Sequence, residues 1–379
     1  MRYKELVLLL FLLATSIAVN AQSEQEIPKV TVGGALRFNY NYSDWKEGSK
    51  DRGGDFGFDV FRIDVDAAYK KIILDAEYRF YSKSSGGGML KSGWLGYAFT
   101  PQDEIQIGLT RVPFGITPYN SHSYFFQINY YVGLEDDSDM GIKYTHKDTK
   151  WEYSLAFFKN AEELDFGSAS PVSDSRYAYD VAGSNKENNQ LNGQLYFSFG
   201  DQHIKHRLGM SAMVGGLYNI ETGRNGNHNA FAIHYELNVK RWDLKLQLAS
   251  YEKNPENKED DPRDVVVMTA YGAPYAVAAK ANLYTAGLSY TLPVDMGPIS
   301  SLKFYNDFGW MDKRVKRFKD SFQNVAGCMI TAGGVYAYVD YALGKNHAWL
   351  GPEWTNAFAY GGDSNSWHGR ANINLGYYF

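Results

Sequence analysis

Residues 367–379, with the sequence WHGRANINLGYYF, decide the fold of this chain. Every second residue from Ala371 to Phe379 is apolar or aromatic, and the positions between them carry Asn, Gly or Tyr. Because successive side chains of a β-strand point to opposite faces, this strand has one apolar and one largely polar face. A soluble sandwich can alternate in the same way, but chain termini usually fray into solvent and seldom end on an aromatic residue. A closed barrel in a lipid bilayer accounts for both features, with the polar face toward a wet lumen.

The same alternation recurs along the chain and predicts an all-β transmembrane barrel of sixteen antiparallel strands. On residues 58–69, for example, Arg62, Asp64 and Asp66 alternate with apolar residues. Charges at every second position are costly to bury in a soluble core but not in a water-filled lumen. The predicted strands are residues 30–42, 58–69, 71–81, 90–99, 104–112, 140–146, 151–160, 191–199, 204–218, 231–239, 242–251, 282–292, 302–311, 325–332, 335–343 and 367–379.

The predicted connections alternate between short turns and long loops. The long loops are residues 43–57, 113–139, 161–190, 252–281 and 344–366. Short periplasmic turns and long outer loops are the expected asymmetry, so both ends of the barrel should lie on the periplasmic side. The patterns are weakest at residues 90–99 and 325–343, and fourteen or eighteen strands remain as alternatives.

Residues 1–21 have the features of a secretory signal peptide. Arg2 and Lys4 precede a mostly apolar run, and Val19-Asn20-Ala21 is a small-residue cleavage site. The apolar run is too short for a comfortable membrane span. We therefore expect the mature chain to begin at Gln22 and residues 22–379 to form one barrel domain, with an uncleaved anchor as the alternative.

Composition narrows the class further. A mean hydropathy of −0.41 suits a barrel in which only alternate residues are apolar. Aromatic residues make up 16% of the chain, as expected for strands and for the aromatic belts at membrane interfaces. The single Cys328 excludes an intramolecular disulfide framework. A formal net charge of −5 gives no global field for nucleic acid.

The third long loop, residues 113–139, carries an aromatic and apolar run over residues 124–132. A loop bathed in water would not normally carry such a run, so we expect it to pack against the barrel wall. Its position resembles that of the inward-folded third loop of general porins, which implies a constriction. The alternative is a loop folded outward into a subunit contact. The tyrosines of this loop that could form a surface for stacking sugars are Tyr119, Tyr124, Tyr130 and Tyr131.

Two segments carry a resemblance to a known family. GLTRVPFG, residues 108–115, resembles the Gly-x-x-Lys/Arg-x-Pro-Phe-Gly element of the phosphate-selective porin O and P family of Gram-negative outer-membrane porins. FRIDVDAAYKK, residues 61–71, resembles the Arg-rich second strand of that family. The terminal Phe379 also resembles the C-terminal signal of bacterial outer-membrane barrels. The resemblance implies a homotrimeric channel in the outer membrane, inserted by the barrel assembly machinery among lipid and lipopolysaccharide.

The charges of the predicted lumen depart from the family pattern. Where the family tends to place further basic residues, this chain has Asp64 and Asp66, and the next strand adds more carboxylates. We expect a mixed-charge patch and weak ion selectivity, so that phosphate is a possible solute and not a certain one. The predicted basic lumen residues are Arg37, Arg62, Arg79, Arg111 and Lys143, and the acidic ones are Asp64, Asp66, Asp75 and Glu77.

One basic cluster falls in a predicted outer loop. It could funnel anions, bind lipopolysaccharide phosphates or form a solvated loop, and the last two interpretations are favoured. The cluster consists of Lys313, Arg314, Lys316, Arg317 and Lys319.

Signals for an enzyme or a metal site are weak. His234 and Glu236 are the best candidate pair for a barrel hydrolase, but two alternate lumen residues are more often structural. The acidic residues at 252–264 lack the fixed spacing of a calcium loop, although outer-loop carboxylates could bind divalent ions loosely. We expect no catalytic residue, no cofactor and no dedicated metal site. The predicted function is a passive channel for small polar or charged solutes; the alternatives are a sugar-preferring channel, a barrel enzyme or a surface adhesin.

Overall fold

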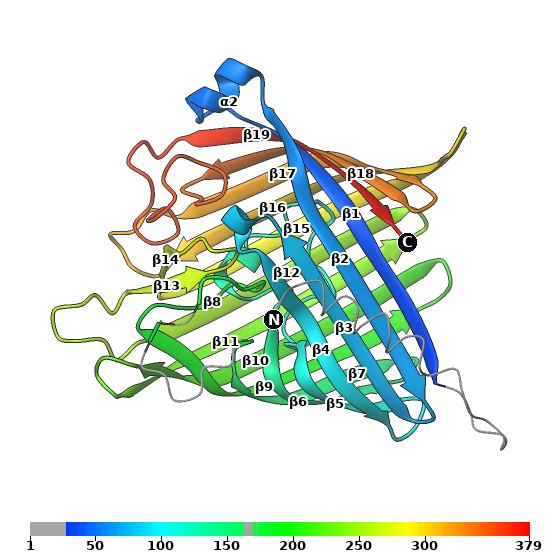
Figure 1. The fold of residues 1–379 in the computed structure, drawn as a ribbon, viewed down its shortest axis with the longest axis horizontal. Coiled ribbons are helices and arrows are strands. Elements are labelled where there is room, and N and C mark those ends of the chain that lie inside the picture. Colours follow the sequence, from blue (N-terminus) through cyan, green and yellow to red (C-terminus); the bar gives the residue numbers. More distant parts are fainter. Residues whose placement is uncertain (1–27, 163–169, 172) are drawn as a thin grey trace, which may run out of the picture.

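The computed structural model describes residues 28–162, 170–171 and 173–379, so the expected signal peptide lies outside the described residues. Within this part of the chain, sixteen strands form a closed antiparallel barrel (Figure 1). The predicted barrel of sixteen strands is therefore confirmed, and the alternatives of fourteen or eighteen are wrong. The barrel strands are β1 (Lys29–Ser43), β2 (Asp55–Tyr69), β3 (Ile72–Tyr81), β4 (Gly88–Ala98), β5 (Asp103–Arg111), β6 (Ser138–Lys147), β7 (Trp151–Asn160), β9 (Asn185–Gly200), β10 (Ile204–Asn219), β11 (Asn225–Val239), β12 (Trp242–Asn254), β15 (Lys280–Met296), β16 (Ile299–Lys313), β17 (Ser321–Ala332), β18 (Val335–Lys345) and β19 (Trp367–Tyr378).

The last strand closes the barrel by pairing with the first. The β1–β19 ladder places Phe38 opposite Leu375 and Arg37 opposite Gly376. Beyond it, Phe379 N–H donates to the Gly34 carbonyl at 3.1 Å, and Gly34 N–H donates to the Phe379 carbonyl at 3.0 Å. The terminal residue is thus held by the sheet, and closure leaves no unpaired edge.

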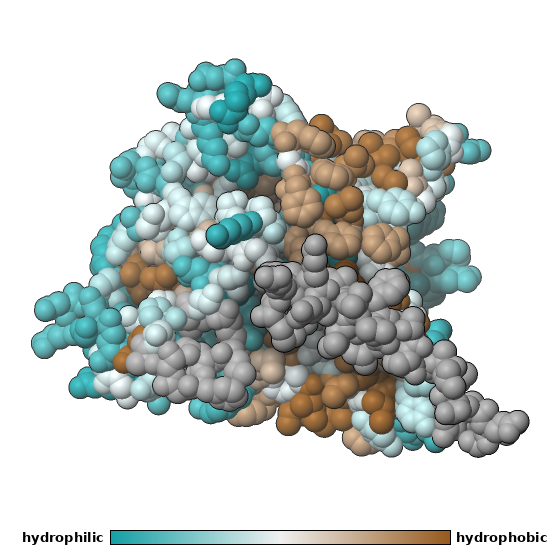
Figure 2. All heavy atoms as spheres, viewed as in Figure 1, coloured by the Kyte–Doolittle hydropathy of each residue, from teal (hydrophilic) through white to brown (hydrophobic). Residues whose placement is uncertain are grey.

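The alternation read from the sequence separates the two faces of the barrel. On β19, Leu375 is 43% exposed on the outer face and its neighbour Asn374 is only 1% exposed on the inner face. Apolar surface gathers over the barrel strands, and hydrophilic surface over the end that carries the long loops (Figure 2). Aromatic residues are exposed near both ends of the strands, as in interfacial belts: Trp151, Phe199 and Trp242 beside the short turns, and Phe56, Tyr341 and Trp367 at the loop end.

The structure contains a small sheet, formed by segments of two predicted long loops, that the sequence did not predict. It has the order β14-β13-β8 and consists of β8 (Asp180–Val181), β13 (Val265–Thr269) and β14 (Tyr275–Ala278). These strands are far shorter than the roughly 9–11 residues that cross a bilayer, so a search for membrane strands passes over them. We call this sheet the cap sheet.

The remaining regular structure is short. It comprises the helix α2 (Glu47–Arg52) and the 3-10 helices η1 (Lys83–Ser85) and η2 (Tyr130–Val132). Among the residues that the structure describes, no helix has the length and apolar character needed to cross a membrane.

The hydrophobic core lies inside the barrel, where the cap sheet packs against the third loop. Tyr179, which precedes β8, and Tyr275 of β14 contact each other with ring centroids 5.4 Å apart, and Tyr179 contacts Tyr130 of the third loop at 5.1 Å. Phe358, from the last long loop, stacks on Tyr131 at 6.0 Å. All five rings are at least nine-tenths buried. The long loops therefore form one packed body that is continuous with the barrel interior.

Candidate functional site: a charged constriction in the lumen

L3, residues 112–137 between β5 and β6, runs through the barrel lumen. Its first anchors lie on β10 and β12, far from β5 around the barrel. Gly115 N–H donates to Ser211 Oγ of β10 at 2.9 Å, and Ile116 N–H donates to Gln247 Oε1 of β12 at 2.8 Å. The Gly115 carbonyl accepts a hydrogen bond from the Tyr196 hydroxyl of β9 at 2.7 Å. L3 is thus folded inward and not outward into a subunit contact.

The middle of L3 continues along the β15–β17 wall. Asn120 Nδ2 donates to Thr285 Oγ1 of β15 at 2.9 Å. The backbone N–H groups of His122 and Ser123 both donate to Asp307 Oδ2 of β16 at 2.8 Å. Gln323 of β17 donates to the Phe126 carbonyl at 2.9 Å. Because buried backbone groups need partners, these polar wall residues are what allows a loop to lie inside the barrel.

His122 is the charged element of this anchoring. Its Nδ1 lies 2.9 Å from Asp307 Oδ1, and its Nε2 lies 3.4 Å from Asp243 Oδ1 of β12. Burial disfavours the imidazolium, but the nearby carboxylates of Asp243 and Asp307 outweigh this effect and raise the pKa of His122. Protonation therefore strengthens the link between L3 and two strands of the wall.

Gly115 has a geometric reason to be glycine. Its φ is +66°, which lies in the left-handed region that residues with a Cβ rarely adopt. A Cβ at this position would lie 2.7 Å from Gln247 Oε1, the acceptor that holds Ile116. The final glycine of the GLTRVPFG segment is therefore required by the turn that directs L3 across the lumen.

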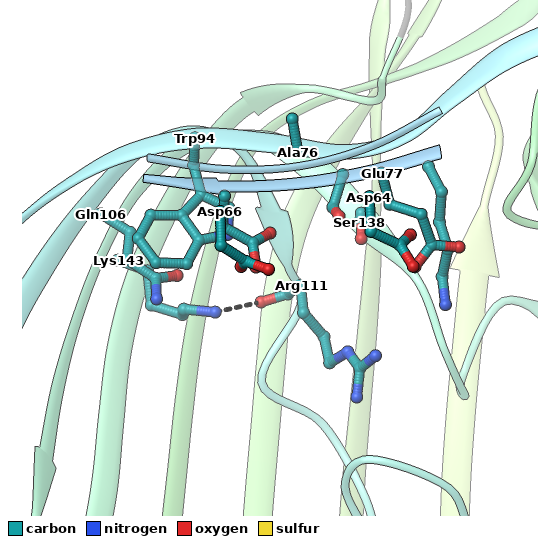
Figure 3. A pocket seen from close by; sticks show the side chains of 12 residues that line it. Asp64, Asp66, Ala76, Glu77, Trp94, Gln106, Arg111, Ser138 and Lys143 are labelled. Carbon is teal, nitrogen blue, oxygen red and sulfur yellow. Dashed lines mark hydrogen bonds between the residues drawn. The ribbon is translucent and has the colours of Figure 1, made fainter. Parts of the chain in front are cut away.

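The wall opposite these anchors borders a cavity of about 390 Å³. Its lining comes from β2 to β6, and six of the nine predicted lumen residues belong to it. Asp64, Asp66 and Glu77 extend from β2 and β3 toward the side on which Arg111 lies, whereas Ala76 points away (Figure 3). The lining residues are Asp64, Asp66, Asp75, Ala76, Glu77, Lys91, Ser92, Trp94, Gln106, Arg111, Ser138 and Lys143.

The register of β2 and β3 places like charges opposite each other. Arg62 faces Arg79, Asp64 faces Glu77, and Asp66 faces Asp75. Directly opposed like charges are destabilising. The ion pairs run along and across the strands instead: Arg62 lies 2.7 Å from Asp64 and 3.8 Å from Glu77, and Arg79 pairs with Glu77. Asp66 and Asp75 have no ion pair with another described residue.

The basic side of the cavity comes from β4 to β6. Lys91 Nζ and an Arg111 nitrogen lie 3.2 and 3.1 Å from Asp136 of L3, which neutralises part of their charge. Lys143 Nζ donates to the Arg111 carbonyl at 3.0 Å, as the dashed line in Figure 3 shows. Sequence reasoning missed Lys91 and Asp136. Lys91 lies beside a strand irregularity that interrupts the alternation, and Asp136 is one of several adjacent carboxylates.

The other three predicted lumen residues are not among those that line the cavity. Arg37 on β1 pairs with Asp59 at 2.9 Å, and its guanidinium lies 5.7 Å from the ring of Tyr124. Arg79 is nearly buried, 4.4 Å from the ring of Tyr177. Arg62 is held by the carboxylates described above, near the ring of Tyr378. All three cations face the lumen, and each has a carboxylate partner.

The predicted tyrosine surface of L3 needs correction. Tyr130 and Tyr131 are buried in the aromatic core and cannot present a ring to a solute. Tyr124 is partly buried and accepts a hydrogen bond from Asn39 at 2.8 Å. Tyr119 is 38% exposed, and its ring lies 5.8 Å from Lys91 and 5.6 Å from Arg111. Of the four, Tyr119 alone has the exposure expected of a stacking residue.

The structure also differs in part from the prediction of a solvated outer basic loop. Lys313 is the last residue of β16, is buried, and donates to the Ala357 carbonyl at 2.7 Å, so it is not a solvated loop residue. Arg314 pairs with Glu252 at 3.0 Å, and Arg317 pairs with Asp264. Lys319 donates to the Gly362 carbonyl at 2.9 Å, and Lys316 is exposed. Most of this positive charge is used in contacts between loops.

The two residues of the candidate catalytic pair have structural partners in the barrel wall. His234 is buried against Tyr196, with ring centroids 4.8 Å apart. Glu236 accepts a hydrogen bond from Arg207 at 2.8 Å.

Comparison with known proteins shows a likeness of fold. No family model and no curated protein matches the chain. Among solved structures, the anion-selective porin from Comamonas acidovorans has a TM-score of 0.60 at 12% identity, covering 93% of this chain and 100% of that one. The outer-membrane channel DcaP of Acinetobacter baumannii has a TM-score of 0.59 at 12% identity, covering 95% and 100%. OmpT, an outer-membrane protein of Vibrio cholerae in its trimer form, has a TM-score of 0.58 at 15% identity, covering 93% and 100%. At these identities, what the chain shares with them is the sixteen-stranded barrel of outer-membrane porins.

Proposed function

We propose that this protein is a passive diffusion channel of the Gram-negative outer membrane for small polar or charged solutes. The observation that carries the proposal is the division of the lumen. L3 covers the β9–β17 wall, and the facing β2–β6 wall borders a cavity lined by charged and polar side chains. The apolar outer face of the strands fits a bilayer, and a barrel of sixteen strands is wide enough for an aqueous path.

Weak ion selectivity is part of this proposal. The cations on the lumen wall mostly have carboxylates within ion-pair distance, such as Arg62 with Asp64 and Lys91 with Asp136. Paired charges leave small local fields of alternating sign, which orient dipolar solutes without excluding either sign of ion. The resemblance to the phosphate-selective porin O and P family would imply phosphate selectivity. Arginines that are already paired with carboxylates give that selectivity little support. The anion selectivity of the Comamonas acidovorans porin belongs to that protein.

A sugar-preferring channel is the second candidate. Tyr119 of L3 is exposed beside the cavity residues Lys91 and Arg111, and Trp94 contributes an aromatic side chain to the cavity lining. An aromatic face supplemented by charged hydrogen-bonding groups suits a sugar ring. A surface adhesin would need no such lumen, and a barrel enzyme would need an accessible catalytic group.

For assembly, we propose a homotrimer, in line with the trimer form described for OmpT. Residues 1–21 would direct export, and the terminal strand would be recognised by the barrel assembly machinery. The partners would then be outer-membrane lipid, lipopolysaccharide and the solutes themselves, without nucleic acid.

The test is conductance in a planar lipid bilayer, using the mature chain refolded in detergent. We expect stepwise current increases on insertion, and vesicles containing the protein should swell in solutions of small sugars. Tyr119→Ala should slow sugar uptake relative to uptake of similar-sized zwitterions if stacking matters. A folded protein that inserts but gives no current steps would contradict the proposal and leave the adhesin and the enzyme.

A further inference from the structure

Three buried carboxylates meet where L3 returns to the barrel. Asp137 ends L3, Asp139 lies at the start of β6, and Asp180 belongs to the cap-sheet strand β8. Their exposed fractions are 5%, 2% and 1%. One oxygen from each carboxylate lies within 4.8 Å of the others. The carboxylate of Asp180 therefore lies in one small buried volume with those of two residues more than forty positions earlier in the chain.

The protein supplies too little positive charge for this cluster. Arg176 lies 3.2 Å from Asp180, but it also pairs with Glu162 at 2.6 Å. Among the described residues, neither Asp137 nor Asp139 has an ion pair with a Lys or Arg side chain. The undescribed stretch at 163–169 contains no basic residue. Several uncompensated carboxylates are very costly away from water, so something else must balance their charge.

A second observation indicates a cation that binds oxygen atoms. Asp137 Oδ1 and Asp139 Oδ1 are buried and have no hydrogen-bond partner among the described residues. Gln190 of β9 is 2% exposed and donates through Nε2 to Asp139 Oδ2 at 3.3 Å, while its own Oε1 has no partner in the part of the chain that the structure describes. Thr110, directly opposite Asp139 in the β5–β6 ladder, is fully buried, and no described residue is a hydrogen-bond partner of its hydroxyl. Cross-strand partners project to the same face, so this hydroxyl lies on the side of Asp139.

We propose that Asp137, Asp139 and Asp180 bind a calcium ion, with the Gln190 carbonyl oxygen and the Thr110 hydroxyl as further oxygen donors. Calcium takes six to eight oxygen ligands from carboxylates, amide carbonyls and hydroxyls in flexible geometry. The donor set holds no His or Cys, which argues against zinc. Magnesium demands a near-ideal octahedron and keeps several waters, which suits a buried, irregular set of protein oxygens less well.

The rival explanation is that the carboxyl groups carry protons. Burial and the surrounding carboxylates raise the pKa of Asp137 and of Asp180 well above the usual range, so a site without metal would hold protons. Protonated carboxyl groups would leave the protein indifferent to calcium. The two explanations therefore differ in one measurable property, which is calcium binding by the folded chain.

The bound ion would join three parts of the fold. Asp137 and Asp139 belong to the end of L3 and to β6, and Asp180 belongs to the cap sheet. Asp136, the residue of L3 that precedes Asp137, pairs with Lys91 and Arg111 at the cavity. The ion would thereby fix the end of the loop that shapes the constriction. Only this last consequence rests on the proposed channel function, because binding itself needs no open lumen.

The experiment uses the mature chain refolded from inclusion bodies, which is free of lipopolysaccharide, and treated with EDTA. Titration calorimetry with calcium chloride should give one calcium ion per chain, and magnesium chloride should bind far more weakly. The triple variant Asp137→Asn, Asp139→Asn, Asp180→Asn should weaken calcium binding by about 100-fold or more, because ligand charge sets calcium affinity. The matched control, Glu259→Gln, Asp260→Asn, Asp261→Asn, changes three exposed loop carboxylates and should bind as the wild type does.

A second readout does not depend on the variant folding perfectly. Calcium should raise the temperature at which the folded wild-type band converts to the unfolded band in detergent gels, and the same shift should occur in the loop control. The site variant should show no shift, even if its metal-free form is more stable than that of the wild type. Absence of stoichiometric calcium binding by the wild type, equal affinity for magnesium, or unchanged binding in the site variant would each overturn the assignment. Calcium binding by a protein that conducts no current would leave this inference standing and remove the proposed function.

Discussion

The two halves of the lumen wall use inward-facing polar residues in different ways. On β9–β17, residues such as Ser211, Gln247 and Asp307 bond to the backbone of L3 and are covered by it. On β2–β6, residues such as Asp64 and Asp75 border an open cavity. Both halves follow the same alternation along their strands. Alternation therefore tells which side chains face the lumen, whereas the path of one loop decides which of them meet a solute.

The chemistry of the two walls fits this division. The covered wall presents hydroxyl, amide and carboxylate oxygens, which satisfy the backbone N–H groups of a loop removed from water. The open wall presents opposed like charges that only a wet lumen tolerates, such as Asp66 facing Asp75. Substitutions that are chemically alike should consequently have unlike effects on the two walls.

The largest difference is expected between Asp307→Ala and Asp75→Ala. Asp307 accepts hydrogen bonds from two L3 backbone N–H groups and contacts His122, so its loss should cost about 3–5 kcal/mol of unfolding free energy. Asp75 faces Asp66 without an ion pair among the described residues, so its removal should be neutral or slightly stabilising. Urea unfolding followed by tryptophan fluorescence measures both. Equal costs would show that L3 is not held by the covered wall.

Two neighbouring residues of β5 test which side chains of the open wall face the lumen and which face the lipid. Ile107 is exposed on the outer face and Gln106 lines the cavity. Ile107→Arg should cost about 2–4 kcal/mol near the bilayer midplane, while Gln106→Arg should cost little because its charge remains in the wet lumen. Reversible unfolding in lipid vesicles gives the two values. Similar costs for both arginines would mean that the assigned faces are wrong.

Local physics explains why the barrel was predictable from the sequence. Each strand carries its own apolar and polar face, so strands such as β19 could be recognised one at a time. The inward path of L3 followed from its aromatic run. The burial of Tyr130 and Tyr131 did not, because it depends on the cap sheet and the last loop, whose contacts are distant in sequence.

The fine structure of the site was likewise beyond the sequence. The register that sets Asp64 opposite Glu77, and so moves the ion pairs off the ladder, depends on the turn between β2 and β3. The lumen position of Lys91 was not predicted, because a strand irregularity breaks the alternation at this point. The cluster of Asp137, Asp139 and Asp180 has no spacing that a metal motif would show, since β8 is brought to L3 only by tertiary packing.

Gly115 tests the entry of L3 into the lumen. Gly115→Ala should cost about 1–3 kcal/mol, because alanine is strained at a φ of +66° and its Cβ would crowd Gln247. Gly57→Ala is the matched control, since Gly57 has no positive φ and a Cβ there would meet nothing within 4 Å. Chemical unfolding compares the two. A cost at Gly115 no larger than that at Gly57 would argue against the turn as the determinant of the loop path.

The smallest effect concerns pH and His122. Its pKa is raised in the folded protein, so its contribution to stability is complete below the unfolded value of about 6.5 and is lost as pH rises through the higher folded value. As pH rises above the unfolded value, the unfolding free energy of the wild type should therefore fall more than that of His122→Gln. The difference between the two pH profiles isolates this group from other titrating residues. Parallel profiles would show that His122 does not hold L3 through its charge.

The central claim is that solutes pass along the open β2–β6 wall, and the reversal potential in a potassium chloride gradient tests it most directly. The wild type should give a small potential, because the cations of the wall and most of its carboxylates lie close to charges of opposite sign. The quadruple variant Asp64→Asn, Asp66→Asn, Asp75→Asn, Glu77→Gln should shift the potential toward anion selectivity, since Arg62 and Arg79 then lose their carboxylate partners. The exposed-loop control, Glu259→Gln, Asp260→Asn, Asp261→Asn, should leave it nearly unchanged. A quadruple variant with the potential of the wild type would contradict the account, because the path of ions would then lie away from this wall.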